Sequence, residues 1–293
     1  MPPKSRLGQN FLRDQQAIGR IVAALGDCTD RTVVEIGPGQ GAITRELARK
    51  AGKLIAVEVD PELAARLSVA FSSHATDSSS RTAAGSNVSI ETIDVLSFDF
   101  AAVSAAAGQK LIVVGNLPYY ITSPILMRLA ESSGVLDRAV LMVQREVADR
   151  VTAKPGSRDY GLLSVAVQLH GQVEPLFTLP PGAFVPPPEV HSTVIRWRFA
   201  PRFEELGLER APFLAFLRQV FALKRKTLAN NLRAAGYSAE SISDALTASA
   251  IDSKARAEAL PIESLAALWR TLKKEGATSH GEAAPETNLR LDQ

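Results

Sequence analysis

The residues best suited to chemistry are four consecutive ones, Asn116-Leu117-Pro118-Tyr119, followed directly by Tyr120. They come after the run Leu-Ile-Val-Val-Gly, which is typical of a buried parallel strand. The Asn116 side chain offers a carbonyl acceptor, and because Pro118 has no N–H we expect its carbonyl to be free as a second acceptor. Tyr119 adds a flat apolar face, so the group suits a planar base with an exocyclic amino group. Asn and Pro are also common in turns, and the tetrapeptide alone does not separate these two interpretations.

A glycine-rich segment follows the first predicted strand, at residues 32–36, and precedes a predicted helix. It reads Glu35-x-Gly37-x-Gly39-x-Gly41, and glycines at such a turn let a ligand approach the backbone closely. The spacing differs from the Gly-x-Gly-x-x-Gly of dinucleotide-binding folds, so a pyrophosphate cofactor is not favoured.

Acidic residues end the next two predicted strands. Glu58 follows residues 54–57, where an acid can bind two ribose hydroxyls. Asp94 follows residues 88–93, where an acceptor can take the amino group of an adenine ring. Each residue alone is as readily explained by a surface carboxylate or a turn amide. Because the carboxyl ends of parallel strands meet at one edge of a sheet, we expect both acids to lie beside Asn116 and form one ligand site.

The order of the predicted elements indicates an α/β protein with an appended helical part. Strands alternate with helices up to about residue 200, which is typical of a mostly parallel sheet covered on both faces. Strands at residues 173–177 and 193–199, joined only by a proline-rich loop, predict an antiparallel pair at one edge. Later segments have only helical spacing. We therefore predict an α/β domain at 1–200, a small all-α domain at 201–275 and a disordered tail at 276–293.

Composition limits the classes of protein and the cellular compartments that fit the chain. It has 293 residues, 46% of them hydrophobic, and a formal net charge of +2, which does not by itself indicate a nucleic-acid binder. Between Arg218 and Arg233 there are basic residues and no acid, a pattern that a solvated helix face also explains. The one cysteine, Cys28, excludes an internal disulfide and fits a reducing compartment. With no signal-peptide core, no membrane-spanning run and no metal-ligand spacing among the histidines, we expect a cytoplasmic monomer without a metal.

The strand-end pattern resembles the class I (Rossmann-like) methyltransferases that use S-adenosylmethionine, and Asn-Leu-Pro-Tyr resembles the motif of enzymes that methylate adenine N6. A closer resemblance, over residues 5–275, is to the small-subunit ribosomal RNA adenine dimethyltransferases. It rests on a combination of motifs, none of which is specific alone. They are Gly8-Gln9-Asn10-Phe11-Leu12, Glu35-Ile36-Gly37-Pro38-Gly39, Asn116-Leu117-Pro118-Tyr119, Phe184 with Pro186-Pro187-Pro188, and Arg225-Lys226-Thr227-Leu228 with Asn230-Asn231-Leu232.

The resemblance implies a mostly parallel seven-stranded sheet and a site for S-adenosylmethionine. The residues that it places around the cofactor are Asn10, Leu12, Gly37, Glu58, Asp94 and Asn116. Those that it places around the substrate base are Asn116, Pro118, Tyr119 and Phe184. The two rings would stack on a base that has left its own stack, while the two acceptors take the hydrogens of its amino group. The implied reaction dimethylates N6 of two adjacent adenines near the 3′ end of 16S rRNA, in a small-subunit precursor.

Other functions remain open at this stage. The same core occurs in 23S rRNA methylases of the erythromycin-resistance type, although the helical C-terminal part favours the small-subunit type. A ribosome-assembly factor that acts mainly by binding, and a DNA adenine methylase, are further alternatives. Two departures from the family pattern are a longer segment at residues 72–87, expected to be a flexible surface loop, and Glu189-Val190-His191, where a Lys-Val-Asp type sequence is commoner.

Overall fold

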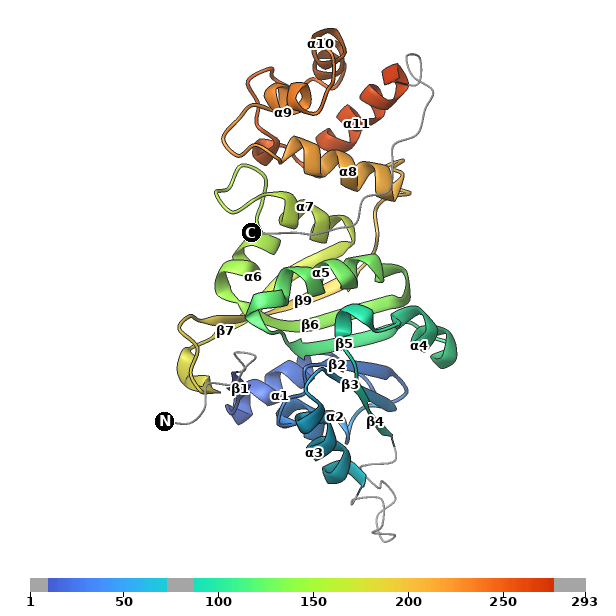
Figure 1. The fold of residues 1–293 in the computed structure, drawn as a ribbon, viewed down its shortest axis with the longest axis vertical. Helices are drawn as coiled ribbons and strands as arrows, with labels where there is room; N and C mark the ends of the chain where they lie inside the picture. The colour runs from blue at the N-terminus through green and yellow to red at the C-terminus, as the bar shows by residue number, and fades with distance from the viewer. Residues whose placement is uncertain (1–9, 73–86, 277–293) are drawn as a thin grey trace. The chain divides into compact units, whose positions relative to one another are not determined.

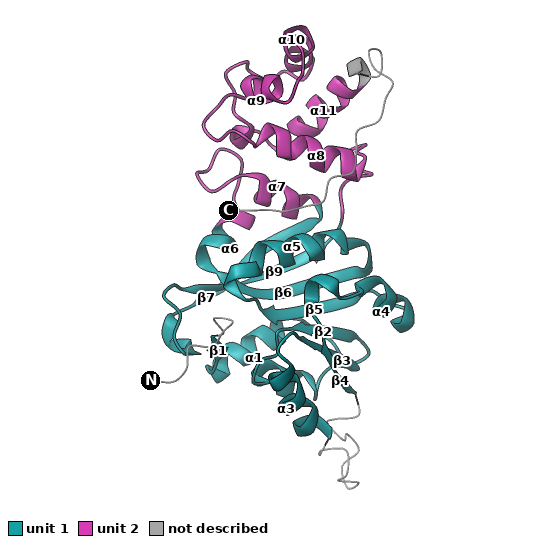
Figure 2. Cartoon of the chain, in the orientation of Figure 1, with its two compact units in different colours: residues 1–149, 170–200 teal, residues 150–169, 201–293 magenta. Residues whose placement is uncertain are grey.

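The computed structural model describes residues 10–72 and 87–276, and the chain divides into two compact units (Figures 1 and 2). The first unit comprises residues 1–149 and 170–200, and the second comprises residues 150–169 and 201–293. Residues 150–169 thus belong with the helical unit, although the sequence placed them before a boundary at residue 200. The reason is that Val165 and Leu169 pack into the helical core. The loop predicted at 72–87 and the tail predicted at 276–293 lie, except for their terminal residues, outside the described residues.

The first unit is built on a seven-stranded sheet with the order β4-β3-β2-β5-β6-β9-β7. Neighbouring strands are parallel from β4 to β6, and β9 is antiparallel to both β6 and β7. The predicted α/β class and the antiparallel pair at one edge are therefore confirmed. The strands are β2 Thr32–Ile36, β3 Lys53–Glu58, β4 Val88–Thr92, β5 Leu111–Asn116, β6 Leu136–Gln144, β7 Gly171–Leu179 and β9 Ser192–Phe199.

Helices supply the crossovers that parallel strands require, and they cover both faces of the sheet. Side chains alternate between faces along a strand, so Ile112 and Val114 of β5 belong to one core, which also contains Ile18 and Ile21 of α1. In Figure 1, α5 crosses in front of β6 and β9, and its inward side chains are buried. The helices are α1 Gln15–Ala24, α2 Ala42–Leu47, α3 Pro61–Ser72, α4 Phe100–Ala107, α5 Thr122–Glu131 and α6 Arg145–Val151.

A second, two-stranded sheet joins distant parts of the first unit. β1 Phe11–Leu12 pairs antiparallel with β8 Phe184–Val185, and the N–H of Arg13 donates to the Ala183 carbonyl at 2.9 Å. No sequence pattern predicts these strands, because two residues are too few to show a period of two. The pairing fixes the start of the described chain beside the main sheet.

The second unit is a helical bundle with its own apolar core. Phe213 lies at its centre, with ring centroids 5.9 Å from Phe216 and 5.7 Å from Trp269. Gly236 follows the C-cap of the helix at residues 228–234 with φ +94°, a left-handed conformation that glycine favours at a helix end. The helices are α7 Leu162–Leu169, α8 Arg210–Val220, α9 Leu228–Ala234, α10 Ala239–Ala248 and α11 Ile262–Gly276.

A buried amide holds the loop between α8 and α9. Asn231 is 3% exposed; its Oδ1 accepts from the N–H of Leu223 at 2.8 Å, and its Nδ2 donates to the carbonyls of Leu223 and Thr227 at 3.4 Å. The loop carries three consecutive exposed cations, Lys224, Arg225 and Lys226, and Arg225 has φ +67°. These cations of the acid-free run therefore lie in a turn between two helices rather than on the face of one helix.

We expect Asn231→Ala to lower the free energy of unfolding by about 1–3 kcal/mol, since it deletes a buried amide and leaves the N–H of Leu223 without its acceptor. The matched control is Asn230→Ala, at an exposed neighbour whose Oδ1 accepts from Arg233 on the helix surface. That variant should stay within about 0.5 kcal/mol of the wild type. Urea denaturation measures both, and equal losses would contradict the role assigned to Asn231.

Candidate functional site

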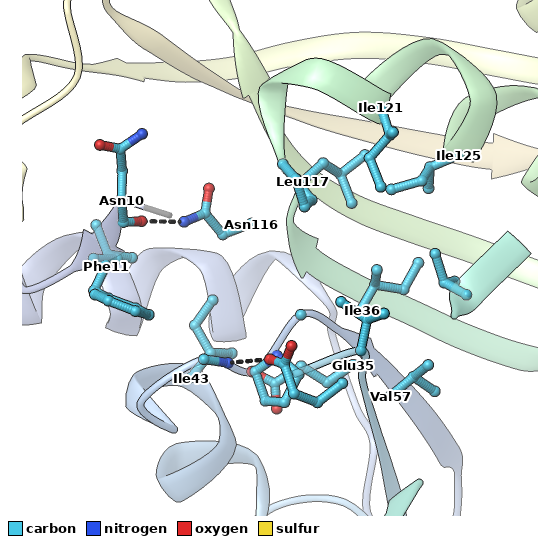
Figure 3. Close-up of a pocket in the computed structure, with 18 of the residues that line it drawn as sticks. Asn10, Phe11, Glu35, Ile36, Ile43, Val57, Asn116, Leu117, Ile121 and Ile125 are labelled. Carbon is cyan, nitrogen blue, oxygen red and sulfur yellow. Dashed lines mark hydrogen bonds between the residues drawn. The ribbon is translucent and has the colours of Figure 1, made fainter. Parts of the chain in front are cut away.

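A pocket opens at the carboxyl ends of β2, β3 and β5 (Figure 3). It is lined by residues from these strand ends, from the glycine-rich loop, from β1 and from the start of α5. All the predicted site residues except Phe184 line it: Asn10, Leu12, Gly37, Glu58, Asp94, Asn116, Pro118 and Tyr119. The structure therefore brings together residues that are spread over more than a hundred positions of the chain.

The glycine-rich loop is shaped by positions that only glycine tolerates well. Gly37 has φ +64° and Gly39 has φ +55°, in the left-handed region. A Cβ atom on Gly39 would lie 2.9 Å from Cε1 of Phe11, which is closer than such atoms approach. The Phe11 ring can therefore pack against the loop only because residue 39 has no side chain.

The two predicted strand-end acids stand in different surroundings. Glu58 is 3% exposed, and its carboxylate accepts from the N–H of Gly39 at 3.1 Å and of Asp60 at 3.0 Å, one bond to each oxygen. Each of these oxygens keeps a second lone pair, which suits a diol. Asp94 is exposed, and its Oδ1 accepts from the N–H of Leu96 at 2.9 Å, so Oδ2 is the atom that can accept from a ligand.

Glu35, a member of the glycine-rich motif for which no separate role was predicted, also lines the pocket. It is 2% exposed, and its Oε2 is buried without a hydrogen-bond partner among the residues that the structure describes. Burial raises the pKa of Glu35 to about 7; the charge of Glu58 adds to this effect, and hydrogen bonding from Thr44 opposes it. An acid inside the buried run Thr-Val-Val-Glu-Ile was the signal that could have identified it.

Asn116 has a defined orientation in the pocket. Its Nδ2 donates to the main-chain carbonyl of Asn10 at 2.8 Å. A carbonyl can only accept, so the NH2 end of the amide must face Asn10. Oδ1 then lies on the other side of the group, as Figure 3 shows. The predicted acceptor at this position is thus the end of the side chain that remains for a ligand.

The expectation for Pro118 was wrong. Its carbonyl is not free, because it accepts from the N–H of Ile121 at 3.2 Å and from Oγ1–H of Thr122 at 3.0 Å. These bonds begin the helical turn that leads into α5. The preceding residue, Leu117, also lines the pocket, and no donor from the described parts of the chain reaches its carbonyl. Leu117 therefore replaces Pro118 as the candidate for a second acceptor.

The two predicted stacking rings are placed differently. Tyr119 is half-buried in the pocket wall, and its hydroxyl is 2.6 Å from Oγ of buried Ser192, while burial raises the pKa of Tyr119. Phe184 is 2% exposed, pairs with Leu12 across the small sheet and packs in the core beside α1. A ring so enclosed offers no face to a base, so Phe184 is not placed to stack, and Tyr119 is the ring of these two that lines the pocket.

Across residues 10–72 and 87–276, no three His, Cys, Asp or Glu side chains come close enough together to hold a metal ion. Within the same residues, no helix combines the length and the apolar character needed to cross a membrane. Cys28 is buried as a free thiol.

The raised pKa of Glu35 makes stability depend on pH. Between the ordinary pKa of 4.5 and the folded value of about 7, the folded state binds a proton that the unfolded state does not. Rising pH therefore lowers the free energy of unfolding across this window, and Glu35 causes no further loss above its folded pKa. We expect Glu35→Gln to flatten the fall in the urea midpoint between about pH 5 and pH 7. Glu62→Gln, at an exposed glutamate of α3, should keep the wild-type slope, and identical slopes in all three proteins would contradict the assignment.

Comparison with known proteins assigns the family. A model described as ribosomal RNA adenine dimethylase matches residues 3–274. A ribosomal RNA small subunit methyltransferase A from Acidobacterium capsulatum is 55% identical over 270 residues, covering 92% of this chain and 91% of the relative. The protein of the same name from Koribacter versatilis is 48% identical over 282 residues, covering 92% and 95%.

Solved structures agree on the fold. The 23S rRNA methyltransferase ErmE is 26% identical, with a TM-score of 0.66, and the match covers 90% of this chain and all of that one. A dimethyladenosine transferase from Plasmodium falciparum has a TM-score of 0.72 at 22% identity, which shows the fold alone, with 91% and 98% covered. These likenesses confirm the predicted class I methyltransferase fold. With the strand-end site and a family match over nearly its whole length, the chain belongs to the ribosomal RNA adenine dimethylase family.

Proposed function

We propose that the protein transfers methyl groups from S-adenosylmethionine to N6 of two adjacent adenines near the 3′ end of 16S rRNA in the small ribosomal subunit, giving N6,N6-dimethyladenine. The observation that carries the proposal is the oriented amide of Asn116, which keeps an acceptor in a pocket shared with two strand-end acids. The names of the two relatives described above support the small subunit as substrate. We place this activity in the cytoplasm and assign it to a monomer.

The residues of the pocket fit S-adenosylmethionine. Glu58 has lone pairs to accept from two ribose hydroxyls, and Asp94 has Oδ2 to accept from an adenine amino group. Gly37 and Gly39 let the backbone approach a ligand, and a Cβ on Gly39 would collide with Phe11. The cofactor supplies an electrophilic methyl group on a sulfonium. The N-terminal segment, from Asn10 to Leu12, would close the pocket from the side of β1.

The protein's part in the reaction is to hold an amine that is otherwise a poor nucleophile. The lone pair of adenine N6 is delocalised into the ring. Oδ1 of Asn116 and the carbonyl of Leu117 would accept its two hydrogens and localise the lone pair on nitrogen. Positive charge grows on that nitrogen in the transition state, where both acceptors stabilise it, so no prior general base is required. Stacking on Tyr119 adds ~1–3 kcal/mol of binding.

The direct test is to incubate the protein with methyl-labelled S-adenosylmethionine and unmethylated small subunits, large subunits or DNA. Label should enter small-subunit rRNA, and mass spectrometry should identify N6,N6-dimethyladenine. Label confined to large subunits would assign the erythromycin-resistance type of reaction instead, and label confined to DNA would assign a DNA methylase. Tight binding to small subunits without methyl transfer to any substrate would indicate a ribosome-assembly factor that acts by binding.

Asn116 variants test the acceptor. Asn116→Ala should lower turnover by roughly 10²–10³, the loss expected when one preorganised hydrogen-bond partner is removed, with little change in cofactor affinity. Asn116→Asp keeps an acceptor but, when ionised, sets an oxygen against the Asn10 carbonyl. When protonated, its O–H can donate there as Nδ2 does. Its activity relative to the wild type should therefore rise as the pH is lowered.

Turnover measured from about pH 5.5 to pH 8, with calorimetry of S-adenosylmethionine binding as the control, gives the answer. Asp and Ala variants that are equally inactive at every pH, with cofactor binding intact, would exclude the acceptor role. The second methyl transfer presents an amine with a single hydrogen, so a weakened variant should also release a larger fraction of monomethyladenine.

We further propose that the helical unit contacts rRNA through the turn that carries Lys224, Arg225 and Lys226. Replacing all three by Gln should flatten the salt dependence of small-subunit binding by about one unit of slope per lost phosphate contact. Lys254→Gln, at an exposed lysine of the same unit, is the control and should leave the slope unchanged. A wild-type slope in the triple variant would mean that the turn is only a solvated surface.

A further inference from the structure

A second pocket lies next to the site and has a different character. Its lining shares three residues with the first pocket, Leu12, Gln40 and Ala42, so the two are neighbours. The remaining lining residues are polar or charged: Arg13, Gln15, Arg45 and Glu46. Nothing in the function proposed above uses this pocket.

The pocket presents two guanidinium groups without a matching acid. Arg13 and Arg45 are exposed, and within the described residues neither forms an ion pair. Arg45 donates from Nη1 to the Gly41 carbonyl at 3.1 Å, which holds its side chain at the pocket. Glu46, the acid of the lining, is 3.2 Å from Nη1 of Arg49, so a cation outside the lining offsets its charge. The pocket is therefore electropositive.

Neighbouring polar groups do not change that sign. The carboxylate of Asp14, next to Arg13, caps α1 by accepting from the N–H of Ala17 at 3.0 Å. Gln15 and Gln40 are exposed and add neutral amide donors to the lining. Planar guanidinium groups and side-chain amides both offer N–H donors, and together they are well suited to bind phosphate oxygens.

The chain fixes how far this pocket lies from the base site. Asn10, whose carbonyl orients Asn116, is three residues before Arg13, and the intervening residues form β1. Three residues span at most ~11 Å. The Arg13 backbone therefore lies within ~11 Å of Asn10, the residue that orients the amide proposed to bind the target adenine.

We propose that Arg13 and Arg45 form a binding site for phosphates of the rRNA strand that flanks the target adenine, an inference that rests on the proposed function. Drawing a base out of its stack costs free energy, and contacts to the flanking backbone offset part of it. Such contacts position a strand without reading its sequence. The rival ligand is the carboxylate of the cofactor's methionine moiety. One guanidinium group would neutralise a single carboxylate, whereas this second, solvent-open pocket presents two.

The test compares Arg13→Gln, Arg45→Gln and the double variant with Arg66→Gln, which removes another exposed arginine of the same unit, one on α3 that pairs with Glu62. Binding of the full-length proteins to unmethylated small subunits is measured over a series of potassium chloride concentrations. Each pocket substitution should reduce the salt slope by about one unit, and Arg66→Gln should not. Arg13→Lys and Arg45→Lys keep the charge and should keep the slope. The KM for small subunits should rise in the Gln variants while kcat at saturation stays near the wild-type value.

Two results would overturn the proposal. Salt slopes of the pocket variants equal to that of Arg66→Gln would remove the phosphate role. Unchanged slopes with a large loss of S-adenosylmethionine affinity by calorimetry would assign the pocket to the cofactor carboxylate. If the wild type itself neither methylates nor binds small subunits, the proposed function fails, and this outcome is distinct from both.

Discussion

The hydrogen bond from Nδ2 of Asn116 to the Asn10 carbonyl joins residues 106 positions apart, and the arrangement of the site depends on it. At one of its ends is the last residue of β5, Asn116, which pairs with Met142 of the neighbouring strand β6. At the other end is a segment held by the two residue pairs of the small sheet. The bond therefore does two things: it fixes which atom of the amide faces a ligand, and it ties the N-terminal segment across the pocket.

Burying two carboxyl groups in the site costs folding free energy. Glu35 and Glu58 are both almost fully buried, and they belong to adjacent strands, β2 and β3. Two backbone N–H groups satisfy the carboxylate of Glu58, whereas the Oε2 atom of Glu35 has no such donor within the described structure, and its pKa is raised. Buried polar groups without partners are costly, and they occur where function requires them. A positively charged ligand beside Glu35 would lower its pKa again, so binding of such a ligand near neutral pH should release a proton.

The sequence predicted the parts of the site that follow from strand geometry. Glu58, Asp94 and Asn116 could be placed together because parallel strands end at one edge, whatever the details of packing. Pro118 and Phe184 could not be placed correctly. The carbonyl of Pro118 is engaged by donors three and four residues later, and Phe184 is buried by a strand of two residues, so both depend on contacts without a periodic signature. The same limit explains the error at residues 150–169, where the core that buries Val165 is formed by helices far along the chain.

The division of the chain has a consequence for how such proteins can be rearranged. The chain passes between the two units three times, near residues 149, 169 and 200, so the helical unit is not a simple C-terminal addition. A protein truncated after residue 200 would keep α7 but would lack the later helices whose side chains share a core with Val165 and Leu169. The product would expose apolar surface and tend to aggregate. Exchange of the helical unit between relatives therefore requires two joined segments to move together, which favours its inheritance with the catalytic unit as one piece.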